Sequence, residues 1–360
     1  MSPLTKKLLR DLWRLRGQVL AIALVVASGV AVLVMSLTAL EALSATASAY
    51  YDRYRFADVF AGVKRAPDRL ARRIAGLDGV QTVETRIVQF AILDVEGFEE
   101  PVVGQLVSIP EGREPHLNRL ALRSGRLVEP DRPDEIVLSE PFAAAHGFKV
   151  GDQLEAVINA AKRPLEIVGI ALSPEFVYAI GPGALMPDDK RFGIIWMGRE
   201  ALAAAYDLDG AFNDITLSLL PHESPETMID RLDPLLERYG GTGAIAREDQ
   251  ISNWFVNNQL DELRTMATIL PTIFIAVAAF LTNMVLGRLI ATERAEIGLF
   301  KAFGYSDLEV GWLYIKMVMV MTMVSIAIGW AAGAWLGRFN TQLYAEFYHF
   351  PFLLYRPSPA

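Results

Sequence analysis

The chain has 360 residues, of which 52% are hydrophobic, and a formal net charge of −8. An acidic chain lacks the basic face that nucleic-acid binding requires, so we expect no nucleic-acid partner. The absence of cysteine excludes disulfides, thiolate metal sites and a cysteine nucleophile. The hydrophobic residues are concentrated in three blocks, which is typical of a membrane protein and not of a soluble enzyme.

The N-terminal residues 1–16 predict a cytoplasmic amphipathic helix, because leucines recur on one side and basic residues fall largely elsewhere. Residues 17–40 are uncharged and apolar and predict the first transmembrane helix. The competing interpretation is a cleaved signal peptide with Ala45-Thr46-Ala47 as its cleavage site. The apolar core of such a peptide is only about 7–15 residues long, so the longer run favours a membrane span.

Residues 41–264 predict a large α+β extracytoplasmic domain. Its ends, to about residue 54 and from about residue 252, predict helices that extend the neighbouring spans as a stalk. Two strand–helix–strand patterns, at 56–95 and 214–247, could pair in one layered subdomain. Between them, about residues 100–209 predict an inserted β-rich subdomain. Its expected strands are 135–139, 154–158 and 165–170, and its expected short helices are 141–146 and 199–206.

Two further apolar runs predict transmembrane helices over residues 265–287 and 311–337. Five Lys and Arg residues precede the first span, so the positive-inside rule places the N-terminus in the cytoplasm. The 288–310 segment, which joins the second and third spans, is therefore also cytoplasmic. Residues 338–360 predict an extracytoplasmic connection.

The 288–310 segment predicts a short helix, a stop and a new helix. Residues 292–303 can form about three helical turns. Gly304 tolerates the left-handed conformation that commonly ends a helix. Ser306 and Glu309 form a capping box, and Tyr305 with Val310 are spaced as the hydrophobic staple around it.

The residues of this segment also resemble a known family. Glu-Arg-x-x-Glu-Ile-Gly-x-x-Lys-Ala-x-Gly-x-Ser, at 293–306, is similar to the cytoplasmic coupling segment of ABC transporter permeases of the FtsX, MacB and LolCDE kind. In that family this helix docks into a groove of an ATPase. Phe300 and Phe303 stand at positions that vary in the family. The resemblance implies an ATPase-coupling interface formed by Glu293, Arg294, Glu296, Ile297, Gly298, Lys301, Ala302, Gly304 and Ser306.

Residues 134–170 resemble the periplasmic core domain of MacB-like permeases, which has a split βαβ base and an inserted subdomain. The expected fold is thus an α-helical membrane protein with three transmembrane helices and a MacB-like extracytoplasmic core. The family has a fourth span after the third. The resemblance therefore implies a truncated permease or the first half of a longer one.

The function implied by the resemblance is that of a permease subunit of an ABC transporter. ATP hydrolysis by a separate cytoplasmic ATPase would move the outer domain, for export or extraction of a lipoprotein, lipid, peptide or drug. The chain itself would be non-catalytic and would bind no cofactor, because ATP and Mg belong to the ATPase. Further implied partners are a second permease unit, membrane lipid and a periplasmic adaptor or substrate protein. The implied location is the bacterial inner membrane.

Other sequence features agree with a non-catalytic membrane subunit. There is no Gly-x-x-x-x-Gly-Lys-Ser/Thr phosphate loop, and the four histidines have no metal-like spacing. Gly329, Gly333 and Gly337 are four residues apart and predict a helix-packing groove, although glycine is common in membrane helices in general.

Two interpretations of another class stay open. A sensor would bind a ligand outside and signal inward, but residues 288–310 are too short to be an output domain. A scaffold would regulate envelope enzymes through the outer domain. The sequence does not specify the substrate.

Overall fold

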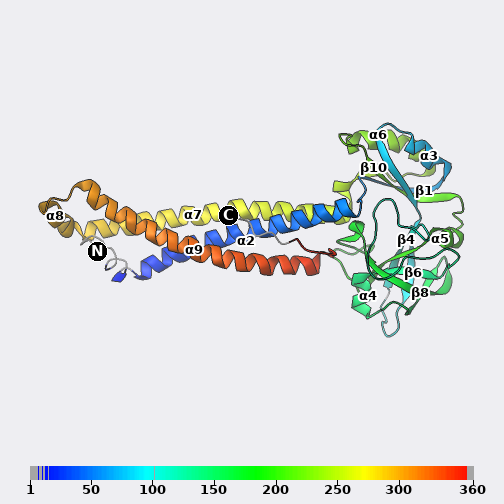
Figure 1. Cartoon of the computed structure of the whole chain (residues 1–360), viewed down its shortest axis with the longest axis horizontal. Coiled ribbons are helices and arrows are strands. Elements are labelled where there is room, and N and C mark those ends of the chain that lie inside the picture. The colour runs from blue at the N-terminus through cyan, green and yellow to red at the C-terminus, as the bar shows by residue number, and fades with distance from the viewer. Residues whose placement is uncertain (1–6, 8–9, 11–12, 15, 101, 355–360) are drawn as a thin grey trace. The chain divides into compact units, whose positions relative to one another are not determined.

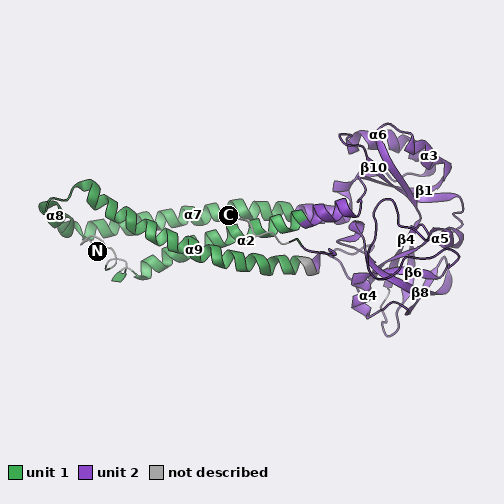
Figure 2. Ribbon diagram, in the orientation of Figure 1, with its two compact units in different colours: residues 1–45, 259–344, 354–360 green, residues 46–258, 345–353 purple. Residues whose placement is uncertain are grey.

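The structure is a computed structural model that describes residues 7, 10, 13, 14, 16–100 and 102–354. Most of the helix predicted over 1–16 lies outside the described residues. The chain divides into two compact units (Figure 2). Unit 1 holds residues 1–45, 259–344 and 354–360, and unit 2 holds residues 46–258 and 345–353.

Long helices form unit 1 (Figure 1). They are α2 (Arg16–Arg53), α7 (Ile251–Thr292) and α9 (Asp307–Phe347), and the short α8 (Arg294–Ala302) lies between α7 and α9. Each long helix has the length and apolar composition needed to cross a membrane. Each contains one predicted span, and the helical ends predicted for the outer domain are confirmed at α2 and α7.

The first part of the connection predicted over residues 338–360 is helical, because α9 continues to Phe347. No proline interrupts the chain between Pro271 and Pro351, so nothing in residues 338–347 breaks the helix. Likewise α7 continues five residues beyond the predicted end of the second span, to Thr292.

Helices α2 and α9 pack closely through the three glycines. A Cβ built on Gly333 would lie 2.7 Å from the carbonyl oxygen of Ala31 and 2.8 Å from the Cβ of Val34. One turn earlier, a Cβ built on Gly329 would lie 2.6 Å from the carbonyl oxygen of Ala27 in α2. A Cβ built on Gly337 would lie 3.1 Å from the Cβ of Thr38. This is the close helix approach that the four-residue spacing predicts.

The base of unit 2 is a four-stranded antiparallel sheet in the order β11-β1-β10-β2. Its strands are β1 (Val59–Pro67), β2 (Val80–Arg86), β10 (Ala211–Leu219) and β11 (Ala244–Ala246). The helices α3 (Arg69–Ala75) and α6 (Pro225–Leu236) pack their apolar residues against it. The two predicted strand–helix–strand patterns are therefore confirmed as one interleaved subdomain.

The second sheet of unit 2 has seven strands in the order β5-β8-β6-β9-β4-β3-β7. Because β7 also pairs with β8, six of these strands close into a ring. The strands are β3 (Val88–Asp94), β4 (Val102–Ile109), β5 (Ala121–Gly125), β6 (Glu135–Ser139), β7 (Gln153–Ile158), β8 (Ala161–Leu172) and β9 (Phe192–Gly198). The short helices are α4 (Glu140–His146), η1 (Pro174–Phe176) and α5 (Arg199–Ala205), with η2 (Glu237–Tyr239) and η3 (Arg247–Asp249) near the base.

The inserted subdomain begins earlier than the predicted residue 100. Strand β3 belongs to the seven-stranded sheet, whereas β2 belongs to the base, and only the buried Ile87 separates them. The prediction also missed β4, β5 and β9. Strand β9 is buried at every position and so lacks the alternating pattern by which a half-exposed strand is recognised.

Candidate coupling site

The candidate site is α8 with its flanking turns, which connect α7 to α9 (Figure 1). The α7 helix ends at Thr292, and Glu293 has the non-helical dihedral angles φ −97° and ψ 15°. The chain therefore changes direction at Glu293, and α8 begins on a new axis. After α8, Gly304 has φ +94°, which confirms the predicted left-handed stop.

The start of α9 is a capping box, as the sequence predicts. The backbone N–H of Ser306 donates to the Glu309 carboxylate at 2.8 Å, and the N–H of Glu309 donates back to the Ser306 hydroxyl at 3.3 Å. These hydrogen bonds from the Ser306 backbone and hydroxyl lower the pKa of Glu309. Val310 is buried, and Tyr305 packs against the same apolar cluster.

One side of α8 is held against the long helices. Ile297 and Phe300 are partly buried on a cluster that includes Leu289 of α7 and Leu313 of α9. No residue of α8 is fully buried, however. The helix is therefore attached by one edge.

The other side of α8 presents large apolar side chains to solvent. Phe303 is 76% exposed, and Leu308 at the start of α9 is 85% exposed. Leu299, one helical turn before Phe303, is also exposed. Isolated exposed apolar residues are ordinary, but three on one short connection form a patch suited to a protein contact.

An ionic cluster lies on the attached edge. The ammonium of Lys7 donates to the Glu293 carboxylate at 2.8 Å and to that of Glu296 at 2.6 Å. The hydroxyl of Tyr314 in α9 donates to Glu293 at 3.1 Å. Hydrogen bonding to Lys7, followed by the charge of Lys7, lowers the pKa of Glu296.

The structure divides the nine predicted interface residues between two roles. Glu293, Glu296 and Ile297 are at least partly buried against their own chain. Exposed residues from the same set are Arg294, Gly298, Lys301, Ala302, Gly304 and Ser306. Sequence reasoning left Leu299 and Leu308 out of the set, although the spacing from Leu299 to Phe303 places those two on one helical face.

Unit 2 contains a polar junction around Glu175 in η1. Its carboxylate pairs with Arg86 of β2, and the amide of Asn118 donates to the same carboxylate at 3.0 Å. Arg86 also donates to Asp214 of β10 at 2.7 Å. The backbone carbonyl of Glu175 accepts from the side chain of Gln250 at 2.9 Å.

The junction ties helix ends to the base sheet and to η1, which follows β8. Asn118 accepts from the backbone N–H of Ala57, just after α2, and Gln250 directly precedes α7. Burial lowers the pKa of Arg86. The carboxylates of Asp214 and Glu175 together raise that pKa by more, so the net shift is upward and the guanidinium stays charged. For Asp214, burial raises the pKa more than Arg86 lowers it. Arg86 thus has two carboxylate partners in the junction, Glu175 and Asp214.

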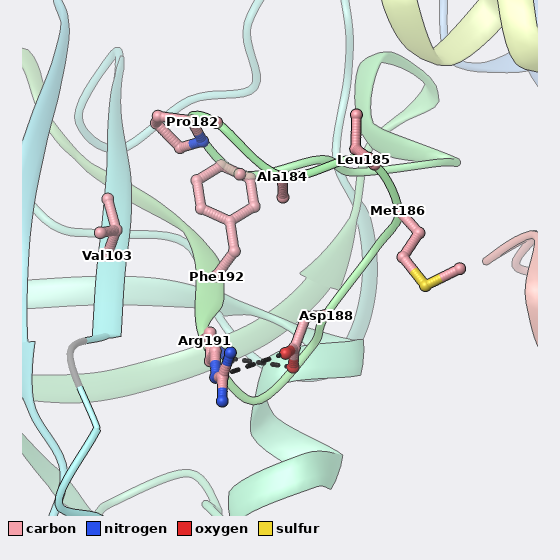
Figure 3. Close-up of a pocket in the computed structure, with 10 residues that line it drawn as sticks. Val103, Pro182, Ala184, Leu185, Met186, Asp188, Arg191 and Phe192 are labelled. Carbon is pink, nitrogen blue, oxygen red and sulfur yellow. Dashed lines mark hydrogen bonds and ion pairs between the residues drawn. The ribbon is translucent and has the colours of Figure 1, made fainter.

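A cavity of about 420 Å³ opens beside the loop that precedes β9 (Figure 3). Val103 and Phe192 line it, and Leu185 on its rim is 95% exposed. Its charged lining residues are Asp188 and Arg191, which pair with each other. The lining thus contains no arrangement of groups for acid–base or nucleophilic chemistry. Within the described part of the chain, no cluster of three His, Asp or Glu side chains could hold a metal.

Comparison with known proteins defines the class. Residues 19–235 match the MacB-like periplasmic core domain, and residues 268–360 match the FtsX-like permease C-terminal family. The chain therefore belongs to the ABC transporter permeases that carry a MacB-like periplasmic core domain and an FtsX-like permease domain. It is a membrane protein with an extracytoplasmic domain, and the family works with an ATPase partner.

A curated relative is an uncharacterized ABC transporter permease protein of Mycobacterium tuberculosis, 22% identical over 221 residues. The match covers 60% of this chain and 24% of that protein, so the chain spans about a quarter of the relative's length.

Two solved structures are similar to parts of the chain. One is the periplasmic region of MacB from Actinobacillus actinomycetemcomitans, with 14% identity, a TM-score of 0.34, and coverage of 55% of this chain and 92% of that one. The other is the extracellular domain of the transporter YknZ from Gram-positive bacteria, with 12% identity, a TM-score of 0.35, and coverage of 53% and 98%.

Proposed function

We propose that the chain is a non-catalytic permease subunit whose α8 segment docks onto a separate cytoplasmic ATPase. We further propose that the long helices carry the resulting movement to the extracytoplasmic domain. The observation that supports this most directly is the set of exposed apolar side chains Leu299, Phe303 and Leu308 on the short connection between two helices that are long and apolar enough to cross a membrane. In this proposal the N-terminus and α8 face the cytoplasm of a bacterial inner membrane.

Gly298 gives independent support for a docked partner. It lies in the middle of α8, where glycine destabilises a helix by roughly 0.5–1 kcal/mol relative to alanine. A Cβ at this position would meet nothing within 4 Å. Packing within the described chain therefore does not require glycine here, whereas close approach of another protein would.

The Glu175 junction suits the second half of the proposal. Residues next to the ends of α2 and α7 share hydrogen-bonded partners with β2 and β10. A helix displaced along its axis would pull on the base sheet of unit 2 through these contacts. The moved substrate could be a lipoprotein, lipid, peptide or drug, and a second permease unit would complete the transporter. ATP and Mg would be bound by the ATPase.

The test is co-purification of ATPase activity with the tagged full chain from detergent-solubilised host membranes. Phe303→Asp should lower the affinity for the ATPase at least about tenfold, because a charge replaces an apolar side chain in the contact. Leu185→Asp is the matched control: it places the same charge at an exposed apolar site of the outer domain, and it should leave the co-purified ATPase unchanged.

If the Phe303→Asp variant recovers as much ATPase as the wild-type chain, α8 is rejected as the docking site. Recovery of only an envelope hydrolase, with no nucleotide-binding subunit, would instead support the scaffold interpretation.

A further inference from the structure

Two described cations of the N-terminal segment lie at the candidate coupling site. Arg10 is exposed and lies 3.7 Å from Glu296, whereas Lys7 is buried. Lys7 and Glu293 are each only 5% exposed, and their charged groups are 2.8 Å apart. The same ammonium lies 2.6 Å from Glu296, one residue of α8 that faces the long helices. A buried lysine is rare unless it is paired, so this contact is specific and is not a surface ion pair.

The two carboxylates hold different parts of the connection. Glu293 is the residue at which the chain changes direction between α7 and α8, and Glu296 lies in the first turn of α8. One ammonium between them therefore fixes both the bend and the helix that follows it. Tyr314 adds a hydrogen bond from α9 to the same Glu293 oxygen that Lys7 contacts.

The other contacts of α8 are exposed ion pairs and partly buried apolar side chains. Arg10 pairs with Glu296, and Lys301 pairs with Asp307 of α9, and every partner in these two pairs is at least 45% exposed. The helix has no fully buried residue, and its apolar attachment consists of the partly buried Ile297 and Phe300. Apolar contact is non-directional, so two side chains on one edge permit rotation of the helix. Charge-assisted hydrogen bonds have defined geometry and restrict that rotation.

We propose that Lys7 is a positioning residue that sets the orientation of α8, so that the N-terminal segment is part of the coupling site. Lys7 contacts no ATPase in this inference and acts through Glu293 and Glu296. The inference rests on the proposed function for its biological meaning, because a correctly oriented α8 matters only if a partner docks there. The orientation itself can be measured without that partner.

The experiment uses the full chain in lipid nanodiscs, without ATPase, and a spin label on Ala302→Cys. The chain contains no cysteine, so this label is unique, and Ala302 is exposed at the end of α8. Lys7→Gln should increase the mobility of the label and remove its immobilised component. Arg14→Gln, which removes an exposed cation of the same segment, should leave the spectrum unchanged.

Two further variants separate positioning from general loss of structure. Glu296→Gln keeps the buried Lys7–Glu293 pair and should give intermediate mobility. Lys7→Arg, which keeps a cation beside both carboxylates, should keep the label immobilised. A label on Leu185→Cys in the outer domain should be unaffected by each of these changes.

An unchanged Ala302→Cys spectrum in Lys7→Gln would overturn the inference, whether or not an ATPase co-purifies with the chain. A gain in mobility in Lys7→Gln that is absent in Lys7→Arg would support it, even if the docking proposal failed its own test. The two proposals are therefore distinguishable.

Discussion

Replacing Glu175 by alanine tests the junction that ties the helix ends to the outer domain. The variant removes the carboxylate that pairs with Arg86 and accepts from Asn118. Arg86 would keep Asp214 as a partner but would lose its second carboxylate while remaining buried. The backbone bond from Gln250 to the Glu175 carbonyl would be retained.

The expected magnitude follows from burial. The side chains of Arg86 and Glu175 are only 8% and 10% exposed. Because Arg86 keeps Asp214, the loss is that of charge-assisted hydrogen bonds in a buried site, which costs about 1.5–3 kcal/mol. The matched control is Asp94→Ala, which breaks an ion pair with Lys162 in which both side chains are more than half exposed. Exposed pairs contribute about 0–1 kcal/mol.

The assay is thermal unfolding of the purified full chain in detergent, followed by tryptophan fluorescence and circular dichroism. For a domain of about 200 residues, each kcal/mol shifts Tm by about 2–4 °C, so Glu175→Ala should lower Tm by about 3–12 °C. Asp94→Ala should shift it by less than about 4 °C. Equal shifts for the two variants would refute the claim that the junction is a buried, structurally important contact.

Three further outcomes are expected. Gly333→Ala should destabilise the packing of α2 on α9 by about 1–3 kcal/mol in steric-trap unfolding. Gly311→Ala should not, because a Cβ there would have no atom within 4 Å. Equal effects of the two variants would argue against close packing at Gly333. Ser306→Ala should cost about 0.5–2 kcal/mol and speed amide hydrogen exchange in the first turn of α9; unchanged exchange would contradict the cap. Hydrogen bonding from Arg126 lowers the pKa of Glu135, so the resulting stability is present above the unfolded pKa and lost as pH falls below about 4.3. The Tm difference between wild type and Arg126→Gln should therefore shrink on acidification, and a constant difference would exclude this linkage.

Local features of the coupling segment could be predicted from sequence because they depend on neighbouring residues. The left-handed Gly304 and the Ser306–Glu309 capping box each involve residues at most three positions apart. The base of the outer domain could be predicted for a related reason, since each of its two strand–helix–strand patterns is contiguous in the chain.

Contacts between distant residues could not be predicted in this way. Lys7 and Glu293 are 286 positions apart, and Arg86 and Glu175 are 89 apart. A single sequence gives each of these residues many possible partners of opposite charge, and only the fold selects one. The predicted start of the insertion failed for another reason: β2 and β3 form one continuous β-rich run, and the change of sheet at Ile87 leaves no turn signal.

The most direct test of the account is the side of the membrane on which α8 lies. A single cysteine at Ala302, in the cysteine-free chain, is exposed to a membrane-impermeant thiol reagent. In intact spheroplasts we expect no labelling at this position and full labelling after permeabilisation, whereas Leu185→Cys in the outer domain should be labelled in both. Labelling of Ala302→Cys from outside intact spheroplasts would contradict the proposed docking of α8 onto a cytoplasmic ATPase.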